Sequence, residues 1–143
     1  MREFRKERLA PRTTLGVGGD ATRLLELDSE AEVISALKTL RQGDNATVIL
    51  GEGSNVVIAD EGLDAVVLRQ KSETITFEHP KRGEVLVHAD GGVALDTLVE
   101  RVVGEGLSGL EGLSGIPGSV GACPVQNVGA YGHQVSDHLQ YVR

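Results

Sequence analysis

Residues 107–132 read LSGLEGLSGIPGSVGACPVQNVGAYG, and this stretch is the most informative part of the 143-residue chain. It is rich in glycine, contains one charged residue, Glu111, and interleaves apolar with amide side chains. A loop this long without secondary structure is uncommon in a compact domain and is usually functional. Small residues let a flat ring lie against the backbone, and Gln126, Asn127 and Tyr131 supply hydrogen-bond donors. We therefore expect a ligand-binding segment here rather than a plain surface loop.

The same stretch has a predicted local structure. Ile116-Pro117-Gly118 predicts a turn, and Ser119 is expected to cap a short helix that begins at Val120. The free N–H groups of that helix would favour an anion or an electron-rich oxygen.

A second glycine-rich segment lies upstream, at Gly51-Glu52-Gly53-Ser54-Asn55, between apolar runs at 47–50 and 56–58. Glycine lets the backbone approach an anion, and successive N–H groups in such a turn form an anion-binding concavity without Lys or Arg. Ser54 and Asn55 add side-chain donors. A tight hairpin-like turn accounts for the same residues, and spacing alone favours that plainer interpretation.

Several familiar site classes are excluded by their missing motifs. No Gly-Lys pair exists for a Walker A loop, and Val56 stands where a Rossmann fingerprint needs its third glycine. The four histidines show no metal-ligand spacing, and no G-x-S-x-G elbow occurs. Cys123, the single cysteine, is expected to be a small buried thiol. We therefore predict neither a catalytic residue nor a metal site.

Composition limits the class of protein further. With 14 basic and 21 acidic residues the net charge is −7, which disfavours non-specific nucleic-acid binding. The basic cluster within residues 1–12 is expected to be a solvated N-terminal arm. No apolar run is long enough to span a membrane, and no signal-peptide core precedes the domain. These features predict a soluble, cytoplasmic protein with no nucleic-acid or membrane partner.

Apolar patterning predicts an α+β fold. Strands are expected at 21–27, 47–50, 56–58, 65–69, 73–78 and 84–88, and residues 135–143 also have a strand-like pattern. A helix is expected over about 30–41, because Ser29 and Glu32 form a capping-box pattern. A second helix follows Gly91-Gly92, with an apolar stripe at Leu95, Leu98, Val99 and Val102.

The two glycine-rich segments together resemble a known family. Residues 48–55 are similar to the pyrophosphate segment of the UDP-N-acetylenolpyruvoylglucosamine reductase family, and 109–111 with 116–132 are similar to its flavin-contacting segment. Thr13-Thr14-Leu15 resembles the family's opening turn, and the blocks occur in the family's order from about residue 9 onward. Two positions depart from the pattern: Arg12 stands where the family often has Asn, and Cys123 replaces another small residue.

This resemblance implies a fold and a partial function. It implies that residues 1–143 are one FAD-binding domain of the vanillyl-alcohol-oxidase/p-cresol-methylhydroxylase type, α+β, with mixed sheets and flanking helices. Family members continue into a substrate-binding domain and a C-terminal segment, which carry an arginine, a proton-donating serine and a glutamate. None of those motifs occurs here, so we expect little or no turnover by this chain alone. A non-catalytic flavin-binding or interaction module remains an alternative, as does another flavoenzyme of the same fold.

The family's reaction passes a hydride from NADPH to FAD and then to the enolpyruvyl group of a UDP-sugar, giving UDP-N-acetylmuramate for peptidoglycan. By resemblance, 51–56 would wrap the FAD pyrophosphate, 116–123 would pack along the flavin, and 126–131 would lie near the ring and the substrate entry. The implied cofactor-binding residues are Ile49, Gly51, Glu52, Gly53, Ser54, Asn55, Val56, Ile116, Pro117, Gly118, Ser119, Gly121, Ala122, Cys123, Gln126, Asn127, Gly129 and Ala130, with Tyr131 binding substrate.

Two further expectations follow from the same resemblance. A Gly53→Asp change is expected to abolish flavin retention, because it adds a Cβ and a charge facing the pyrophosphate. The face on which the substrate domain docks in the family can drive self-association here.

Overall fold

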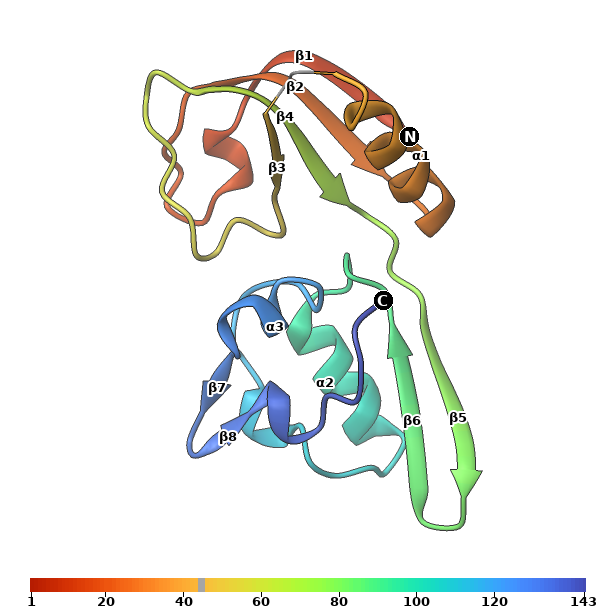
Figure 1. The fold of residues 1–143 in the computed structure, drawn as a ribbon. Helices are drawn as coiled ribbons and strands as arrows, with labels where there is room; N and C mark the ends of the chain where they lie inside the picture. Colours follow the sequence, from red (N-terminus) through yellow and green to blue (C-terminus); the bar gives the residue numbers. More distant parts are fainter. Residues whose placement is uncertain (44–45) are drawn as a thin grey trace. The chain divides into compact units, whose positions relative to one another are not determined.

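The structure, a computed structural model, describes residues 1–43 and 46–143 and divides into two compact units. The N-terminal unit is Met1–Ser72 and the C-terminal unit is Glu73–Arg143 (Figure 1). Each unit has its own sheet and its own hydrophobic clusters. Within the described residues, no helix combines the length and apolar character that crossing a membrane requires.

The N-terminal unit is built on a mixed four-stranded sheet in the order β1-β2-β4-β3. Its strands are β1 (Arg2–Arg8), β2 (Asp20–Leu27), β3 (Thr47–Ile49) and β4 (Leu63–Gln70). β1 runs antiparallel to β2, whereas β2, β4 and β3 are parallel to one another. The strands predicted at 21–27, 47–50 and 65–69 are therefore confirmed.

Alternation along the strands gives this sheet two buried faces. One face packs against α1 (Glu30–Leu40), whose Ala36 lies among side chains of β2 and β4 (Figure 1). The opposite face is covered by the 3₁₀ helix Ala10–Arg12 and by loops. Its buried members are Leu9, Ala21, Leu24, Leu50, Ile58 and Val67.

The start of α1 confirms the predicted N-cap with one difference. The Ser29 hydroxyl accepts a hydrogen bond from the Glu32 N–H at 3.3 Å. The Glu32 carboxylate accepts from the Asp28 N–H at 2.8 Å, one residue earlier than a capping box requires. The helix therefore begins at the predicted place with a shifted return bond.

The basic segment 1–12 is not a solvated arm, which corrects the expectation from its charge. Arg2–Arg8 forms β1, in which Arg2 pairs with Glu26 and Phe4 with Leu24 of β2. Phe4 packs on the buried face of the sheet. Opposite charges across a strand pair stabilise it, and these partners lie far away in sequence.

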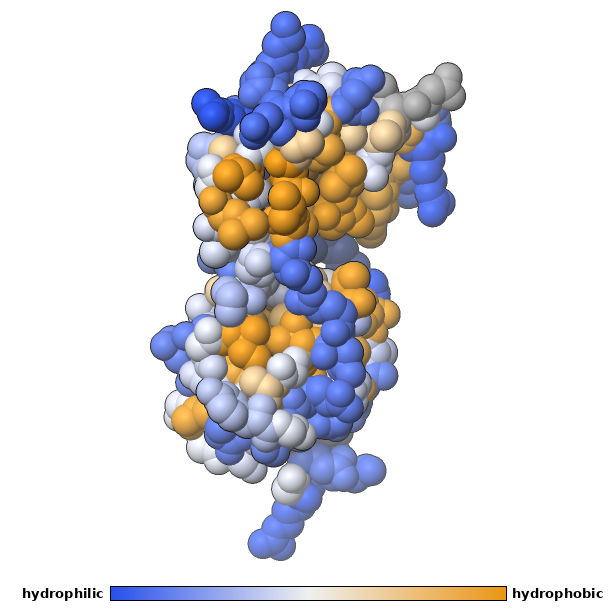
Figure 2. All heavy atoms as spheres, turned by 90° about the vertical axis from the view of Figure 1, so that its left-hand side faces the viewer, coloured by the Kyte–Doolittle hydropathy of each residue, from blue (hydrophilic) through white to orange (hydrophobic). Residues whose placement is uncertain are grey.

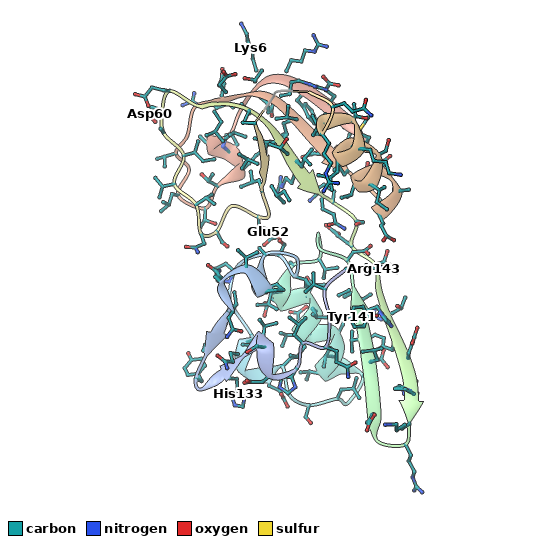
Figure 3. The ribbon with its side chains drawn as sticks, in the orientation of Figure 1. Lys6, Glu52, Asp60, His133, Tyr141 and Arg143 are labelled. Atoms are coloured by element: carbon teal, nitrogen blue, oxygen red, sulfur yellow. The ribbon has the colours of Figure 1, made fainter. Side chains whose placement is uncertain are left out.

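The C-terminal unit packs a hairpin against a helix. β5 (Ile75–Lys81) and β6 (Glu84–Ala89) form the hairpin, and α2 (Leu95–Gly104) buries the predicted stripe. Short elements follow: the 3₁₀ helix Glu111–Leu113, α3 (Cys123–Gln126), β7 (Gly129–Ala130), β8 (His133–Gln134) and the 3₁₀ helix Val135–Asp137. The Tyr141 hydroxyl and His88 Nδ1 of β6 are 3.1 Å apart and join the last residues to the hairpin (Figure 3).

Three expected elements are wrong. Residues 56–58 form no strand, and Ile58 instead packs into the buried cluster with Leu9 and Val67. Residues 135–143 are not a strand, since the Asp137 carboxylate accepts from the Gln134 N–H at 3.0 Å and starts a 3₁₀ helix. Residues 107–132 are not structureless, and the short helix begins at Cys123 rather than Val120.

Candidate functional site

The loop 50–55 leaves the sheet at the carboxyl edge of three parallel strands. β2, β4 and β3 point the same way, so Leu27, Gln70 and Ile49 end at one edge. The N–H of Leu50, which is buried, donates to the Leu68 carbonyl at 2.9 Å before the chain turns away at Gly51. Open sheets with parallel strands bind ligands at this edge.

Gly53 is required by the protein itself. Its φ is +73°, and a Cβ there would lie 2.1 Å from the Arg12 carbonyl oxygen and 2.8 Å from Thr13 Cα. The Thr14 N–H also donates to the Gly53 carbonyl at 3.0 Å. We call residues 12–14 the strap. Gly53 is therefore glycine because the strap crosses it, whereas the sequence suggested room for an anion.

The loop offers backbone N–H groups that the protein does not use. Within 1–43 and 46–143, the N–H groups of Gly51, Glu52 and Gly53 donate to no other group. Ser54 and Asn55 do have partners. Glu52 is exposed on this loop (Figure 3). Successive free N–H groups fit an oxyanion such as a phosphate.

The side chains of two arginines, Arg12 of the strap and Arg69 of β4, meet at the Glu26 carboxylate, and neither was predicted as a site residue. Arg12 and Arg69 have side chains only 17% exposed, and both face the Glu26 carboxylate, which is 6% exposed. Arg12 Nη1 is 2.6 Å from Glu26 Oε1, and Arg69 Nη1 is 3.8 Å from the same oxygen. The departure at Arg12 from the resembled family was the one sequence signal.

Hydrophobic side chains surround the loop. Seen from the side of segments 9–19 and 50–62, the N-terminal unit presents a broad hydrophobic surface (Figure 2). Its exposed apolar residues in and beside those segments include Leu15, Val17, Ile49, Val56 and Val57. An apolar surface with a few convergent N–H donors suits a ligand with both rings and charged groups.

In the C-terminal unit, residues 116–123 use their backbone internally. The Leu95 N–H donates to the Gly118 carbonyl at 2.8 Å, and the N–H groups of Val120 and Gly121 donate to residues 93 and 91. A Cβ at Gly121 would lie 2.9 Å from Gly91 Cα. These bonds remove the free N–H groups expected at Val120. α3 begins at Cys123, and its first turn contains Pro124.

The side chains of this segment divide into buried and exposed sets. Ser119 and Cys123 are buried, and the Cys123 thiol donates to the Ser119 carbonyl at 3.2 Å, as expected for an inert thiol. Pro117 and Gly121 are exposed, and Val125 and Tyr131 are 86% and 91% exposed. The unit thus offers a surface of small and apolar groups on a rigid backbone.

Asn127 maintains the turn between α3 and β8. Its φ is +47°, its Nδ2 donates to Gln134 Oε1 at 2.9 Å, and its Oδ1 accepts from the Ser136 N–H at 3.1 Å. A hollow of about 470 Å³ lies beside this turn. It is lined by Asn127, Gly129, Ala130, Gly132, His133 and Gln134.

Two histidine rings pack against the glycines of the 109–113 turn. A Cβ at Gly109 would lie 2.7 Å from the His138 ring, and one at Gly112 would lie 2.8 Å from the His133 ring. Hydrogen bonds from its own N–H and from the Gly109 N–H, with both histidines nearby, lower the pKa of Glu111. Among the residues described, no group of three or more His, Cys, Asp or Glu side chains could hold a metal ion.

The structure therefore distributes the predicted residues over two units. Residues 51–56 and the preceding Ile49 lie in or beside the loop of the N-terminal unit. Residues 116–131 form one segment of the C-terminal unit. Ser119, Cys123 and Asn127 have clear structural contacts within their unit.

Comparison with known proteins gives concordant matches. A family model described as FAD binding domain matches residues 21–143. The UDP-N-acetylenolpyruvoylglucosamine reductase of Thermobifida fusca is 44% identical over 128 residues, which are 90% of this chain and 36% of that protein. The reductase of the same name from Mycobacterium tuberculosis strain H37Rv is 45% identical over 139 residues, 94% of this chain and 36% of that protein.

A solved structure agrees with these matches. The crystal structure of UDP-N-acetylenolpyruvylglucosamine reductase from Thermus caldophilus matches with a TM-score of 0.72 and 32% identity, over 95% of this chain and 45% of that one. The resemblance and the α+β fold class are therefore confirmed. The chain spans little more than a third of the length of the curated relatives.

Proposed function

Because the chain belongs to the FAD binding domain family, we propose that its two glycine-rich segments hold FAD, both units together forming one FAD-binding domain over residues 1–143. The observation that carries this proposal is the set of unused N–H groups at Gly51, Glu52 and Gly53. They lie at the carboxyl edge of parallel strands, a position at which backbone N–H groups can bind a pyrophosphate.

The two segments would serve different parts of the cofactor. Residues 51–56 would bind the pyrophosphate through backbone N–H groups. The exposed small and apolar groups of 116–123 would lie along the flavin, with Gln126, Gly129 and Ala130 near the ring and Tyr131 at the substrate. FAD, when bound, supplies hydride transfer, and the protein supplies position and electrostatics.

The proposed parent activity is the NADPH-dependent reduction of the enolpyruvyl group of a UDP-sugar. The names of the relatives support it. That reaction also needs a proton donor and a cation that stabilises developing enolate charge. No residue of this chain is assigned to either role, so we expect little or no turnover by the chain alone. The cytoplasmic location and the role in peptidoglycan synthesis belong to the same proposal.

A single proline substitution in the loop tests the role of the N–H groups. Glu52→Pro removes one free N–H together with the side-chain charge, whereas the matched control Glu52→Ala removes only the charge. We expect Glu52→Pro to raise the Kd for FAD about tenfold or more relative to Glu52→Ala, the effect of one hydrogen bond to a charged group. Flavin fluorescence titration of the purified chain measures both.

Two results would contradict the proposal. One is a failure of the unaltered chain to bind FAD, and the other is equal FAD affinity in the two variants. The expectation about turnover is separate: NADPH-dependent reduction of the UDP-sugar by the chain alone would refute it without touching FAD binding.

A further inference from the structure

Arg12 joins two strands through one guanidinium group. Nη1 donates to Glu26 Oε1 on β2 at 2.6 Å, and Nη2 donates to Glu7 Oε1 on β1 at 2.8 Å. The guanidinium carbon also lies 5.4 Å from the centre of the Phe4 ring, within range of a cation–π contact. The side chain is therefore held on three sides by the sheet.

Glu26 is a firm anchor for this arginine. Its carboxylate is 6% exposed, and its other oxygen forms an ion pair with Arg2 Nη2 at 3.1 Å. Arg2 and Arg69 are its register partners on β1 and β4, so the carboxylate sits in a row of charges across three strands. A carboxylate buried this far needs such partners, because an unpaired one would lose its hydration without compensation.

The backbone of the same residue touches the candidate pyrophosphate loop. The Arg12 carbonyl oxygen occupies the place of a Gly53 Cβ, and the neighbouring Thr14 N–H donates to the Gly53 carbonyl. Thr13 ties the strap down from below, its hydroxyl contacting the carbonyls of Ala10 and Val17 at 3.2 and 3.0 Å. The side chain of Arg12 thus binds the sheet through Glu26 and Glu7, while its carbonyl oxygen packs against Gly53.

We propose that Arg12 is a positioning residue for FAD, whose ion pairs with Glu26 and Glu7 hold the strap and through it the loop at Gly53. The inference rests on the proposed function, FAD binding. Desolvation offsets much of the attraction in a buried ion pair, so such a pair contributes little net stability. Its effect here is to fix geometry: the N–H groups of 51–53 face the ligand only if the strap stays in place.

Variants at residue 12 separate charge from packing. Arg12→Met keeps the aliphatic stem and removes both ion pairs, whereas Arg12→Lys keeps the charge. Arg12 Nε has no hydrogen-bond partner among the described residues, so lysine loses nothing at that position. Arg5→Ala is the matched control, because Arg5 lies on β1 but is 83% exposed.

Two measurements on the full 143-residue chain test the proposal. Amide hydrogen exchange without flavin compares the Thr14 N–H, which donates to Gly53, with the Leu50 N–H in the sheet. For Arg12→Met we expect about tenfold faster exchange at Thr14 with Leu50 unchanged, since only the local contact opens. We expect its Kd for FAD to rise about tenfold, with Arg12→Lys closer to the parent and Arg5→Ala equal to it.

Three outcomes overturn the inference. The first is an unchanged Thr14 exchange rate and FAD affinity in Arg12→Met while the parent binds FAD. The second is an equal acceleration at Thr14 and Leu50, which would mean that Arg12 serves general stability. The third is a parent that binds no FAD, which refutes the proposed function, whatever the exchange rates show about the strap.

If Arg12→Met fails to fold, Glu26→Gln replaces it. This change weakens one of the two ion pairs and leaves Glu7 in place, so the same two effects are expected at a smaller size. Parent-like exchange at Thr14 and parent-like FAD affinity in Glu26→Gln would count against the proposal.

Discussion

The two glycine-rich segments both bring two backbones into close contact, but they differ in how the protein uses their N–H groups. In 51–55 the N–H groups of Gly51, Glu52 and Gly53 donate to no other described residue, and glycine lets the strap cross closely at Gly53. In 116–123 the N–H groups of Val120 and Gly121 donate to the carbonyls of Val93 and Gly91, and glycine lets two backbones touch at Gly121 and Gly91. The first segment offers N–H donors on a loop that the strap crosses. The second offers small and apolar groups on a backbone that is bonded to Gly91 and Val93. A high glycine content therefore identifies close backbone contacts without saying which side of the chain a ligand takes.

The largest expected effect is at Gly53. Gly53→Ala should cost about 2–4 kcal/mol of unfolding free energy, because the new Cβ meets the Arg12 carbonyl at a positive φ. The control is Gly16→Ala, which has φ +67° but open space, and should cost about 1 kcal/mol. Urea denaturation without flavin measures both.

Equal losses in the two variants would show that the strap contact is unimportant. The same reasoning corrects the expected use of Gly53→Asp. That variant would lose flavin because it disturbs the strap, so it cannot test the pyrophosphate site.

The second comparison concerns the segment 116–123. Gly121→Ala should cost about 1–3 kcal/mol, since its Cβ would press on the Gly91 backbone. Gly104→Ala, at the end of α2 with open space around it, should instead stabilise the protein by about 0.5–1 kcal/mol. A Gly121→Ala variant as stable as the parent in thermal unfolding would mean that the 91–121 contact yields easily.

The smallest expected effect is a pH-dependent loss of protection at the Glu111 turn, which lies in the C-terminal unit. The folded-state pKa of Glu111 is lowered from 4.5 by N–H donors and nearby histidines, so its contribution to stability is present above that value. It is lost as pH falls below 4.5 and through the lowered pKa. We therefore expect the protection of the Gly109 N–H, its exchange rate compared with the intrinsic rate at the same pH, to fall in acid.

The control for this prediction is Glu111→Gln, which removes the titrating group. Its Gly109 exchange, corrected for the intrinsic pH dependence of exchange, should vary less between neutral and acidic pH. An identical pH profile in the two proteins would show that the carboxylate does not hold this turn.

Strongly patterned segments were predictable from sequence, and segments with distant partners were not. The Ser29 cap and the α2 stripe depend on neighbours three or four residues away, and both were found. The role of 1–12 depends on Glu26, and the place of Ile58 depends on the buried cluster that it joins with Leu9 and Val67. These partners are long-range and leave no local pattern.

The sequence singled out the glycine-rich loop, but it did not show which contact makes residue 53 a glycine. The motif identified 51–55, whereas the reason for Gly53 lies in Arg12, some forty positions earlier. Asn127 stays a proposed neighbour of the flavin, and the sequence did not reveal that both of its amide atoms have partners within the turn.

The sheet order of the N-terminal unit also bears on aggregation. β1 and β3 are its two edges, and an open edge is a template for pairing with another chain. β1 carries the charged sequence REFRKER, and Lys6, with φ +50°, has no register partner between Arg5 and Glu7 (Figure 3). β3 is only three residues long. The basic segment that first suggested a loose tail thus guards the long edge of the sheet against intermolecular strand pairing.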